Sequence, residues 1–133
     1  WAFSTGPSTL LAHTISHVIG ARYHTNHGAV CGIALAETMR FNRDYTLDQL
    51  VLVAEAMGID IKNYSKTEAA DKAINYVQAF LGKIGHPTRL SELGVKADDL
   101  TEMAMQSLTE ITTIFNPRPV SFEDMLKIYQ AVY

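Results

Sequence analysis

Helix start and stop signals divide this chain from one end to the other. A Ser or Thr followed three residues later by an acidic or amide side chain is typical of a helix N-terminus, and the pattern occurs at residues 46–49, 65–68 and 121–124. Gly58 and Gly82 follow two of the expected helices as C-terminal stops. Between these signals apolar residues recur at the helical period, and no alternating run of useful length indicates a strand. The sequence therefore predicts an all-α fold.

The expected architecture is a helical bundle of about six helices in a single domain, residues 1–133. The predicted helices cover residues 7–23, 28–41, 46–58, 65–82, 97–115 and 121–133. Pro7 suits the first turn of the first helix, and the stretch NPRP ends the fifth, because residues before a proline are pushed out of the α region. Asn26 and Gly28 are expected to adopt the special backbone angles between the first two helices. Residues 86–94 form a connector with at most a short helical turn.

The composition is that of a folded globular protein, with 47% hydrophobic and 19% charged residues and a net charge of −3. Lys and Arg are scattered, whereas a nucleic-acid surface requires a basic stripe, so no nucleic-acid partner is expected. No uninterrupted apolar run approaches the roughly 18 residues of a membrane span, so no membrane partner is expected either. Cys31 is the only cysteine and excludes an internal disulfide, which agrees with a cytoplasmic location.

Four of the five histidines fall within residues 11–30, a stretch with a single charged residue, Arg22. These histidines are His13, His17, His24 and His27. In the first expected helix an apolar stripe occupies one face, and His13 and His17 lie on roughly the opposite face. Because imidazoles and small residues take the place of the usual Lys and Glu, we expect both faces of this helix to be covered and the first two helices to lie in the middle of the bundle.

Spacing alone leaves two interpretations of this cluster open. Histidines at i and i+4, such as His13 and His17, project from one helical face and can share an ion such as Zn, Fe, Ni or Cu. The metalloprotease pattern is excluded because Thr14 stands where its Glu would be. Alternatively, the histidines are hydrogen-bonded core residues. Cys31 is a further candidate ligand, although a single thiol in an apolar helix is more often buried filler. The candidate carboxylate partners, which the sequence does not place, are Glu37, Asp44 and Asp48.

Residues 12–42, AHTISHVIGARYHTNHGAVCGIALAETMRFN, resemble the histidine-rich signature of the iron-containing, group III, alcohol dehydrogenases. The matching features are a His-x-x-x-His helix, a following Gly, a short turn, a His-Gly pair and a helix ending in an aromatic residue plus Asn. The stretches LSELGVKADDLTEMA and NPRPVSFEDMLKIY resemble the family's C-terminal region, so the resemblance covers nearly the whole chain. It implies an all-helical, metal-binding domain that follows an α/β nucleotide-binding domain. The chain, which begins without Met, would be a fragment lacking that N-terminal domain.

The resemblance also implies roles for single residues. His13 and His27 match two metal ligands of the family, and the other two ligands, an Asp and a His one helical turn apart, should precede Trp1. His17 matches a catalytic histidine beside the metal and the nicotinamide that takes part in proton relay. His24 matches no required histidine and is expected at the surface or at the lip of a pocket. Relatives often have Asn at the position of Cys31.

The activity implied is reversible hydride transfer between a small alcohol and NAD or NADP, with the metal ion acting as a Lewis acid on the alcohol oxygen. Fe(II) fits the nitrogen and oxygen ligands, and so does Zn(II). The chain by itself would be inactive, and the parent protein is expected to be a homo-oligomer. Two alternatives remain open: a free-standing helical interaction module with structural histidines, and a dimeric metal-binding protein in which each chain contributes two histidines.

Overall fold

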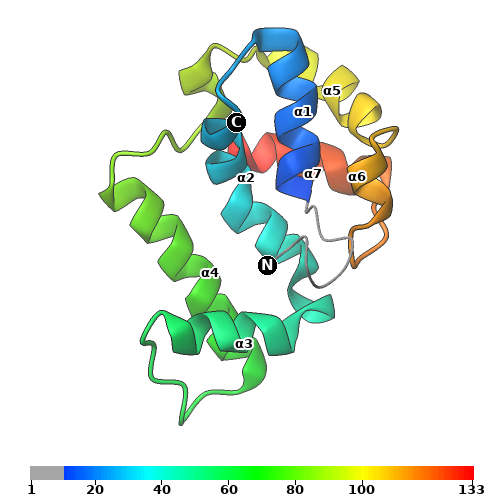
Figure 1. Ribbon diagram of the computed structural model, residues 1–133. Helices are drawn as coiled ribbons and strands as arrows, with labels where there is room; N and C mark the ends of the chain where they lie inside the picture. Colours follow the sequence, from blue (N-terminus) through cyan, green and yellow to red (C-terminus); the bar gives the residue numbers. More distant parts are fainter. Residues whose placement is uncertain (1–10) are drawn as a thin grey trace.

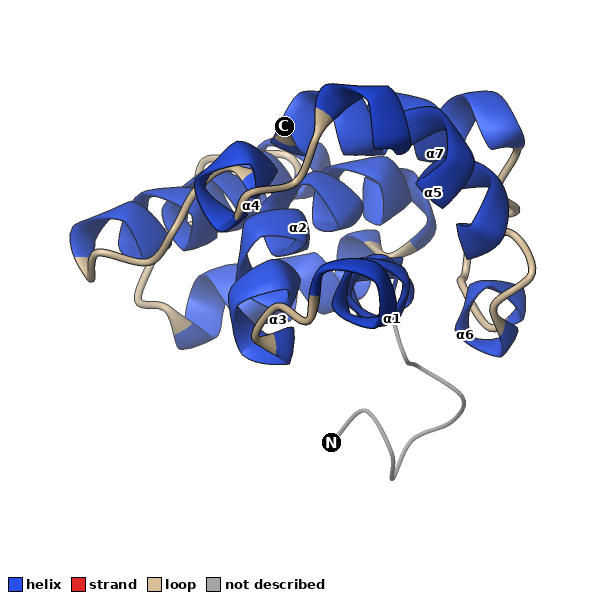
Figure 2. Cartoon of the chain, turned by 90° about the horizontal axis from the view of Figure 1, so that it is seen from above, coloured by secondary structure: helices blue, strands red, loops and turns tan. Residues whose placement is uncertain are grey.

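The computed structural model describes residues 11–133, which contain seven α-helices, three short 3-10 helices and no strand (Figure 1, Figure 2). The α-helices are α1 (Leu11–Tyr23), α2 (His27–Asn42), α3 (Leu47–Ala56), α4 (Lys66–Lys83), α5 (Leu100–Ser107), α6 (Ile111–Ile114) and α7 (Phe122–Val132). The 3-10 helices are η1 (Arg43–Tyr45), η2 (Leu90–Leu93) and η3 (Ala97–Asp99). The all-α prediction is confirmed. The expected start of the first helix at Pro7 lies outside the described residues.

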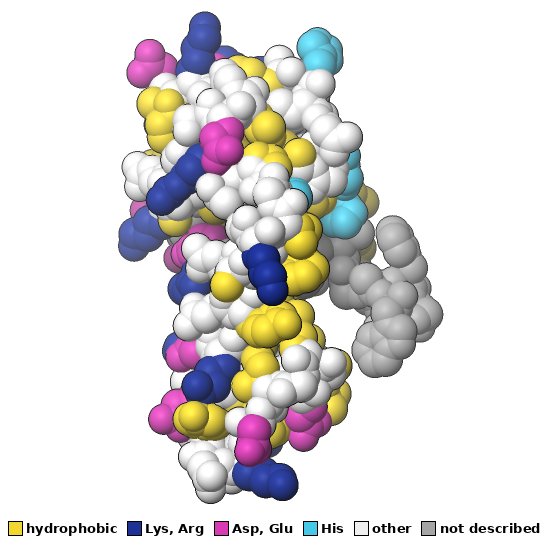
Figure 3. Space-filling view, turned by 90° about the vertical axis from the view of Figure 1, so that its left-hand side faces the viewer, with side chains coloured by type: hydrophobic (Ala, Val, Ile, Leu, Met, Phe, Trp, Pro, Cys, Tyr) yellow, Lys and Arg dark blue, Asp and Glu magenta, His cyan; other side chains and the backbone are white. Residues whose placement is uncertain are grey.

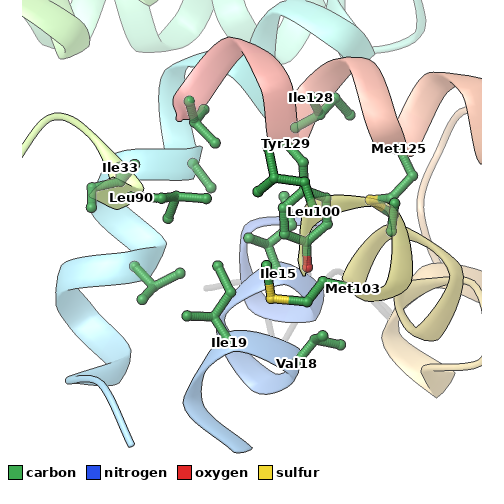
Figure 4. Packing of buried hydrophobic residues seen from close by; sticks show 14 of the residues in the cluster. Ile15, Val18, Ile19, Ile33, Leu90, Leu100, Met103, Met125, Ile128 and Tyr129 are labelled. Atoms are coloured by element: carbon green, nitrogen blue, oxygen red, sulfur yellow. The ribbon is translucent and has the colours of Figure 1, made fainter. Parts of the chain in front are cut away.

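Helix α2 runs through the middle of the molecule and packs against α1, α4 and α7 (Figure 1). Helices α5 and α6 pack against α1, and α3 and α4 pair with each other at the far end of the molecule. The main core fills the space between α1, α5 and α7, where Ile15, Met103 and Tyr129 are completely buried (Figure 4). A second, smaller core lies between α2, α3 and α4 and is built around Leu50 and Ile74. The central position predicted for the second helix is confirmed.

Two of the three predicted N-terminal caps are present. The Ser65 hydroxyl accepts from the Glu68 backbone N–H, and Ser121 accepts from Asp124 in the same way, each with the reciprocal side-chain bond. The cap expected at Thr46 is wrong, because its hydroxyl donates instead to the carbonyl of Asn42 at 3.0 Å. Helix α2 passes directly into η1 there, so the Thr46 side chain has a helical carbonyl within reach and turns away from α3.

The single helix expected over residues 97–115 is also wrong, because it is broken into η3, α5 and α6. At the break, the backbone N–H groups of Leu108, Thr109 and Glu110 each bond to a carbonyl three residues back instead of four. The Thr113 hydroxyl donates to the Ser107 carbonyl at 2.6 Å and closes the turn. Local Ser and Thr hydroxyls therefore compete with the helix for backbone partners at this point.

The turn between α1 and α2 differs in detail from the prediction. His24, rather than Asn26 or Gly28, adopts the left-handed conformation with φ of 54°, and its N–H donates to the Gly20 carbonyl at 2.9 Å. Asn26 is the N-cap of α2, where its side chain accepts from the Ala29 N–H, and Gly28 lies within α2. This three-residue link places the first turn of α2 beside α1.

The C-terminal end of α2 contacts the segment that leads into α7. The side-chain amides of Asn42 and Asn116 donate to each other's oxygens at 2.8 Å in both directions. Arg118 stacks over the Phe41 ring at 4.0 Å and donates to the Phe41 carbonyl at 3.0 Å. Arg118 therefore holds the approach to α7 against the end of α2. Over residues 11–133, no helix combines the length and the apolar character needed to cross a membrane.

Candidate metal centre

Helix α1 and the first turn of α2 bring three imidazoles together. The ring centroids of His13 and His27 lie 4.9 Å apart, those of His17 and His27 5.5 Å apart, and those of His13 and His17 5.9 Å apart. Helical spacing accounts for the pair on α1, and the short link through His24 brings His27 onto the same face. His24 itself is exposed and is not part of the cluster.

The imidazole face of α1 is open, which corrects the expectation that both faces would be covered. The opposite stripe, containing Leu11 and Ile15, is completely buried, whereas the His17 side chain is 42% exposed. His27 is exposed and His13 is partly buried. Histidine side chains are visible along one margin of the molecular surface (Figure 3). The cluster is therefore accessible from outside the domain.

Ser16 fixes the orientation of His27. Its hydroxyl donates to the His27 backbone carbonyl at 2.9 Å and lies 2.9 Å from Nδ1 of the same residue. Because a serine has one hydroxyl proton, which goes to the carbonyl, Nδ1 must be the donor in the second bond. The His27 ring therefore carries its proton on Nδ1 and leaves the lone pair of Nε2 free. No sequence pattern indicates this role for Ser16, since only the fold brings it to His27.

The free Nε2 of His27 faces the thiol of Cys31, one helical turn further along α2. The two atoms are 3.3 Å apart, and Cys31 Sγ also lies 3.7 Å from the Ala12 carbonyl oxygen. One ligand atom from each of His13, His27 and Cys31 lies within 4.8 Å of the others. Two imidazole nitrogens and a sulfur this close together form a donor set that fits a transition metal ion such as Zn(II) or Fe(II).

Burial changes the protonation of two of these groups. Burial and the neighbouring rings of His27 and His17 lower the pKa of His13, which favours the neutral imidazole that metals bind. Burial also raises the pKa of the Cys31 thiol, so without a metal ion this thiol is expected to stay protonated and unreactive.

The carboxylate next to the cluster comes from the broken helix. Glu110, the N-cap residue of α6, places Oε2 3.4 Å from Nδ1 of His17. The two side chains flank a shallow hollow beside α1. None of the three acidic residues considered from the sequence is this partner: Glu37 pairs with Arg40, Asp44 with Arg43, and Asp48 with Lys66. The sequence did not indicate Glu110 as the partner of His17, because the two residues are 93 positions apart.

The fifth histidine has a structural role. The His86 ring packs so closely on α2 that a Cβ added to Gly32 would lie 2.3 Å from its Cε1. Its Nδ1 lies 2.7 Å from the Pro87 carbonyl oxygen. Gly32 therefore allows the connector between α4 and η2 to approach α2 closely.

Fold and site together define an all-helical domain with an open candidate metal centre on its first two helices. The chain belongs to the Fe-containing alcohol dehydrogenase family, whose C-terminal domain model matches residues 2–133. The lactaldehyde reductase of Escherichia coli K12 is 32% identical over 92% of this chain and 32% of its own length. The NAD-dependent methanol dehydrogenase of Bacillus methanolicus is 28% identical over 96% of this chain and 33% of its own length.

Solved structures give the same result. The crystal structure of a 1,3-propanediol oxidoreductase superposes with a TM-score of 0.89 at 29% identity, over 92% of this chain and 32% of that one. An alcohol dehydrogenase from Oenococcus oeni superposes with a TM-score of 0.87 at 27% identity, with the same coverage of both chains. The chain spans about a third of the length of these relatives.

Proposed function

We propose that this chain is the C-terminal, metal-binding part of an oxidoreductase that interconverts small alcohols with aldehydes or ketones by hydride transfer with NAD or NADP. The observation that carries the proposal is the convergence of His13, His17 and His27 on one open face, in a chain of an Fe-containing alcohol dehydrogenase family. The two curated relatives support it, since one is a lactaldehyde reductase and the other a NAD-dependent methanol dehydrogenase.

His13 and His27 are the residues that would hold the metal ion, Fe(II) or Zn(II). Neutral imidazole suits both ions, and burial favours the neutral form of His13 by lowering its pKa. The bond between Ser16 and Nδ1 of His27 leaves Nε2 available to the ion. When bound, the ion supplies a Lewis acid that eases loss of the proton from an alcohol oxygen.

His17 is assigned the transfer of that proton. Glu110 accepts a hydrogen bond from Nδ1 of His17, which orients the ring and keeps a proton on that nitrogen. The other ring nitrogen is then free to accept the alcohol proton and to release it to solvent through the hollow beside α1. Imidazole suits this role because one ring nitrogen can accept a proton while the other donates one.

We propose that the rest of the catalytic site lies on the portion of the protein that precedes Trp1. This portion would supply a nucleotide-binding domain and two further metal ligands, an Asp and a His. Because the nicotinamide and half of the ligands would lie there, the 133-residue chain alone is expected to be inactive. Ile111, Ile114 and Phe115, all exposed on or beside α6, offer an apolar surface for that domain or for a second copy. We also propose that the full-length protein is a homo-oligomer located in the cytoplasm.

Variants of the full-length protein test this function. His27→Ala is expected to lose bound metal and to lower kcat/KM for alcohol oxidation by at least about 100-fold, since losing even a partner outside the ligand set costs about 10–100-fold. His17→Ala is expected to keep the metal and to lower kcat by about 10²–10⁴-fold, the usual contribution of a proton-transfer group. His24→Ala is the matched control, because His24 is exposed outside the cluster.

Metal content and steady-state kinetics with NAD and with NADP measure both effects. Unchanged metal content and activity in His27→Ala would contradict the assigned metal centre. A metal-loaded full-length protein that oxidises no small alcohol with either nucleotide would contradict the proposed reaction.

A further inference from the structure

We propose that Cys31 is a third metal ligand contributed by this chain, beside His13 and His27, and that its sulfur makes the proposed centre prefer Zn(II) to harder divalent ions. The inference rests on the proposed metal centre and deepens it. It adds a ligand that the family resemblance does not supply, because the Asn often found at this position in relatives has no sulfur to offer.

The three ligand atoms already lie at nearly the spacing that a single metal ion requires. The separation of 3.3 Å between Cys31 Sγ and His27 Nε2 is close to the roughly 3.5 Å between neighbouring sulfur and nitrogen ligands of a tetrahedral Zn(II) ion. All three ligand atoms, including that of His13, already lie within 4.8 Å of one another. One ion could therefore contact all three side chains without a rearrangement of the helices that carry them.

The side chains of His27 and Cys31 are also oriented toward each other. His27 and Cys31 are one helical turn apart, so both project from the same face of α2. The hydroxyl of Ser16 keeps the proton of His27 on Nδ1, so the atom that faces the sulfur is the nitrogen with the free lone pair. The unprotonated nitrogen of His27 can bind an incoming cation directly, and the adjacent sulfur of Cys31 can bind the same cation.

The chemistry of a cysteine ligand accounts for the proposed preference for Zn(II). On binding, the S–H bond of Cys31 is replaced by a bond from sulfur to the metal ion, and the proton leaves to solvent. Thiolate is a soft ligand that favours Zn(II), whereas Mn(II) and Mg(II) prefer oxygen. His27 is exposed, which leaves the outer side of the ion open for further ligands or substrate. A lone thiol in a dry core would have none of these features.

Cobalt(II) tests the ligand directly, because a thiolate bound to it produces a charge-transfer absorption in the near ultraviolet that nitrogen and oxygen ligands do not. The full-length protein is stripped of metal with a chelator and titrated with Co(II) under reducing conditions, alongside Cys31→Ser, Cys31→Ala and His27→Ala. We expect one Co(II) per chain, with the charge-transfer band present in the parent protein and lost in both Cys31 variants. The visible cobalt bands should remain in Cys31→Ser.

Metal affinity gives a second readout. Loss of partners outside the ligand set weakens binding by about 10–100-fold, so Cys31→Ser should bind Zn(II) at least about tenfold more weakly. Mn(II) affinity should change less, and the ratio of the two affinities should therefore fall. Circular dichroism of the metal-free variants checks that they fold.

The outcomes separate the two proposals. If the band is absent from the parent protein or persists in Cys31→Ser, while His27→Ala abolishes cobalt binding, Cys31 is not a ligand and the histidine centre stands. If neither the His27 nor the Cys31 variants alter cobalt binding, both the inference and the metal centre on which it rests are overturned. One ion per two chains would also overturn the inference and indicate a symmetric site shared between copies.

Discussion

At the scale of single residues, the candidate centre depends on a side chain outside its own donor set, Ser16. The single hydroxyl proton of Ser16 is given to the His27 carbonyl, which leaves the Ser16 oxygen to accept from Nδ1 of the ring. The same residue thereby joins α1 to the start of α2 and selects the tautomer of His27. Hydrogen bonds of this kind around a metal ligand fix its orientation and its basicity.

Ser16→Ala is predicted to weaken Zn(II) or Co(II) binding by about tenfold, because the His27 ring loses its fixed orientation. The free energy of unfolding should fall by about 1 kcal/mol for the lost hydrogen bonds. Ser107→Ala is the matched control, since its buried hydroxyl bonds to Met103 and Tyr129 in the core, away from the cluster. Competitive metal titration and urea denaturation measure the two effects. Equal metal affinity in both variants would show that Ser16 does not position His27.

At the scale of elements, the shortest α-helix, α6, positions Glu110, the carboxylate that contacts the histidine cluster in the described part of the chain. Helix α6 has four residues and is too short to be stable by itself. It is held against α1 by the bond between the Thr14 and Thr112 hydroxyls, 2.7 Å long and buried at both ends. Glu110 occupies the N-cap position of α6, so its contact with His17 depends on that docking.

Thr112→Val is predicted to lower the free energy of unfolding by about 1–3 kcal/mol, since it leaves the buried Thr14 hydroxyl without its main partner. The amides of α6 should exchange faster with solvent, because the helix is less firmly docked. Thr101→Val, on the exposed side of α5, should change stability by less than about 0.5 kcal/mol. Chemical denaturation and hydrogen exchange provide the measurements, and unchanged exchange at α6 would argue against this docking role.

At the scale of the whole molecule, a polar cluster connects the end of α1 to η3 and α5, 76 to 80 positions further along the chain. Arg22 donates to Asp99 at 2.8 Å and to Glu102 at 2.7 Å, and the Tyr23 hydroxyl donates to Asp99. The bond from Tyr23, followed by the nearby Arg22 charge, lowers the pKa of Asp99. Folding therefore favours the ionised form of this carboxylate.

The sign of the pH dependence follows from that shift. Because the pKa of Asp99 is lower in the folded than in the unfolded state, the stabilisation is fully present above the unfolded value, about 3.9, and is lost as the pH falls through the folded value. Asp99→Asn should be less stable than the parent protein at neutral pH, and the difference should shrink in acid. Asp98→Asn, an exposed neighbour, is the control. Urea denaturation across this range measures it, and a difference that stays constant with pH would refute the linkage.

The sequence by itself determined the helical class, the N-caps of α4 at Ser65 and of α7 at Ser121, and the collection of histidines on the first two helices. These features depend on periodicity and on hydrogen bonds between residues three or four apart, which the order of residues specifies directly. The resemblance of residues 12–42 supplied the family, which the comparison with known proteins confirmed.

Only the tertiary structure decided which groups surround those histidines. The partner of His17 is Glu110, 93 positions away, and the orientation of His27 is fixed by Ser16 on another helix. The break before α6 follows from local Ser and Thr bonds together with the buried contact between Thr14 and Thr112. Each of these features depends on contacts between separate helices, which helical periodicity does not encode.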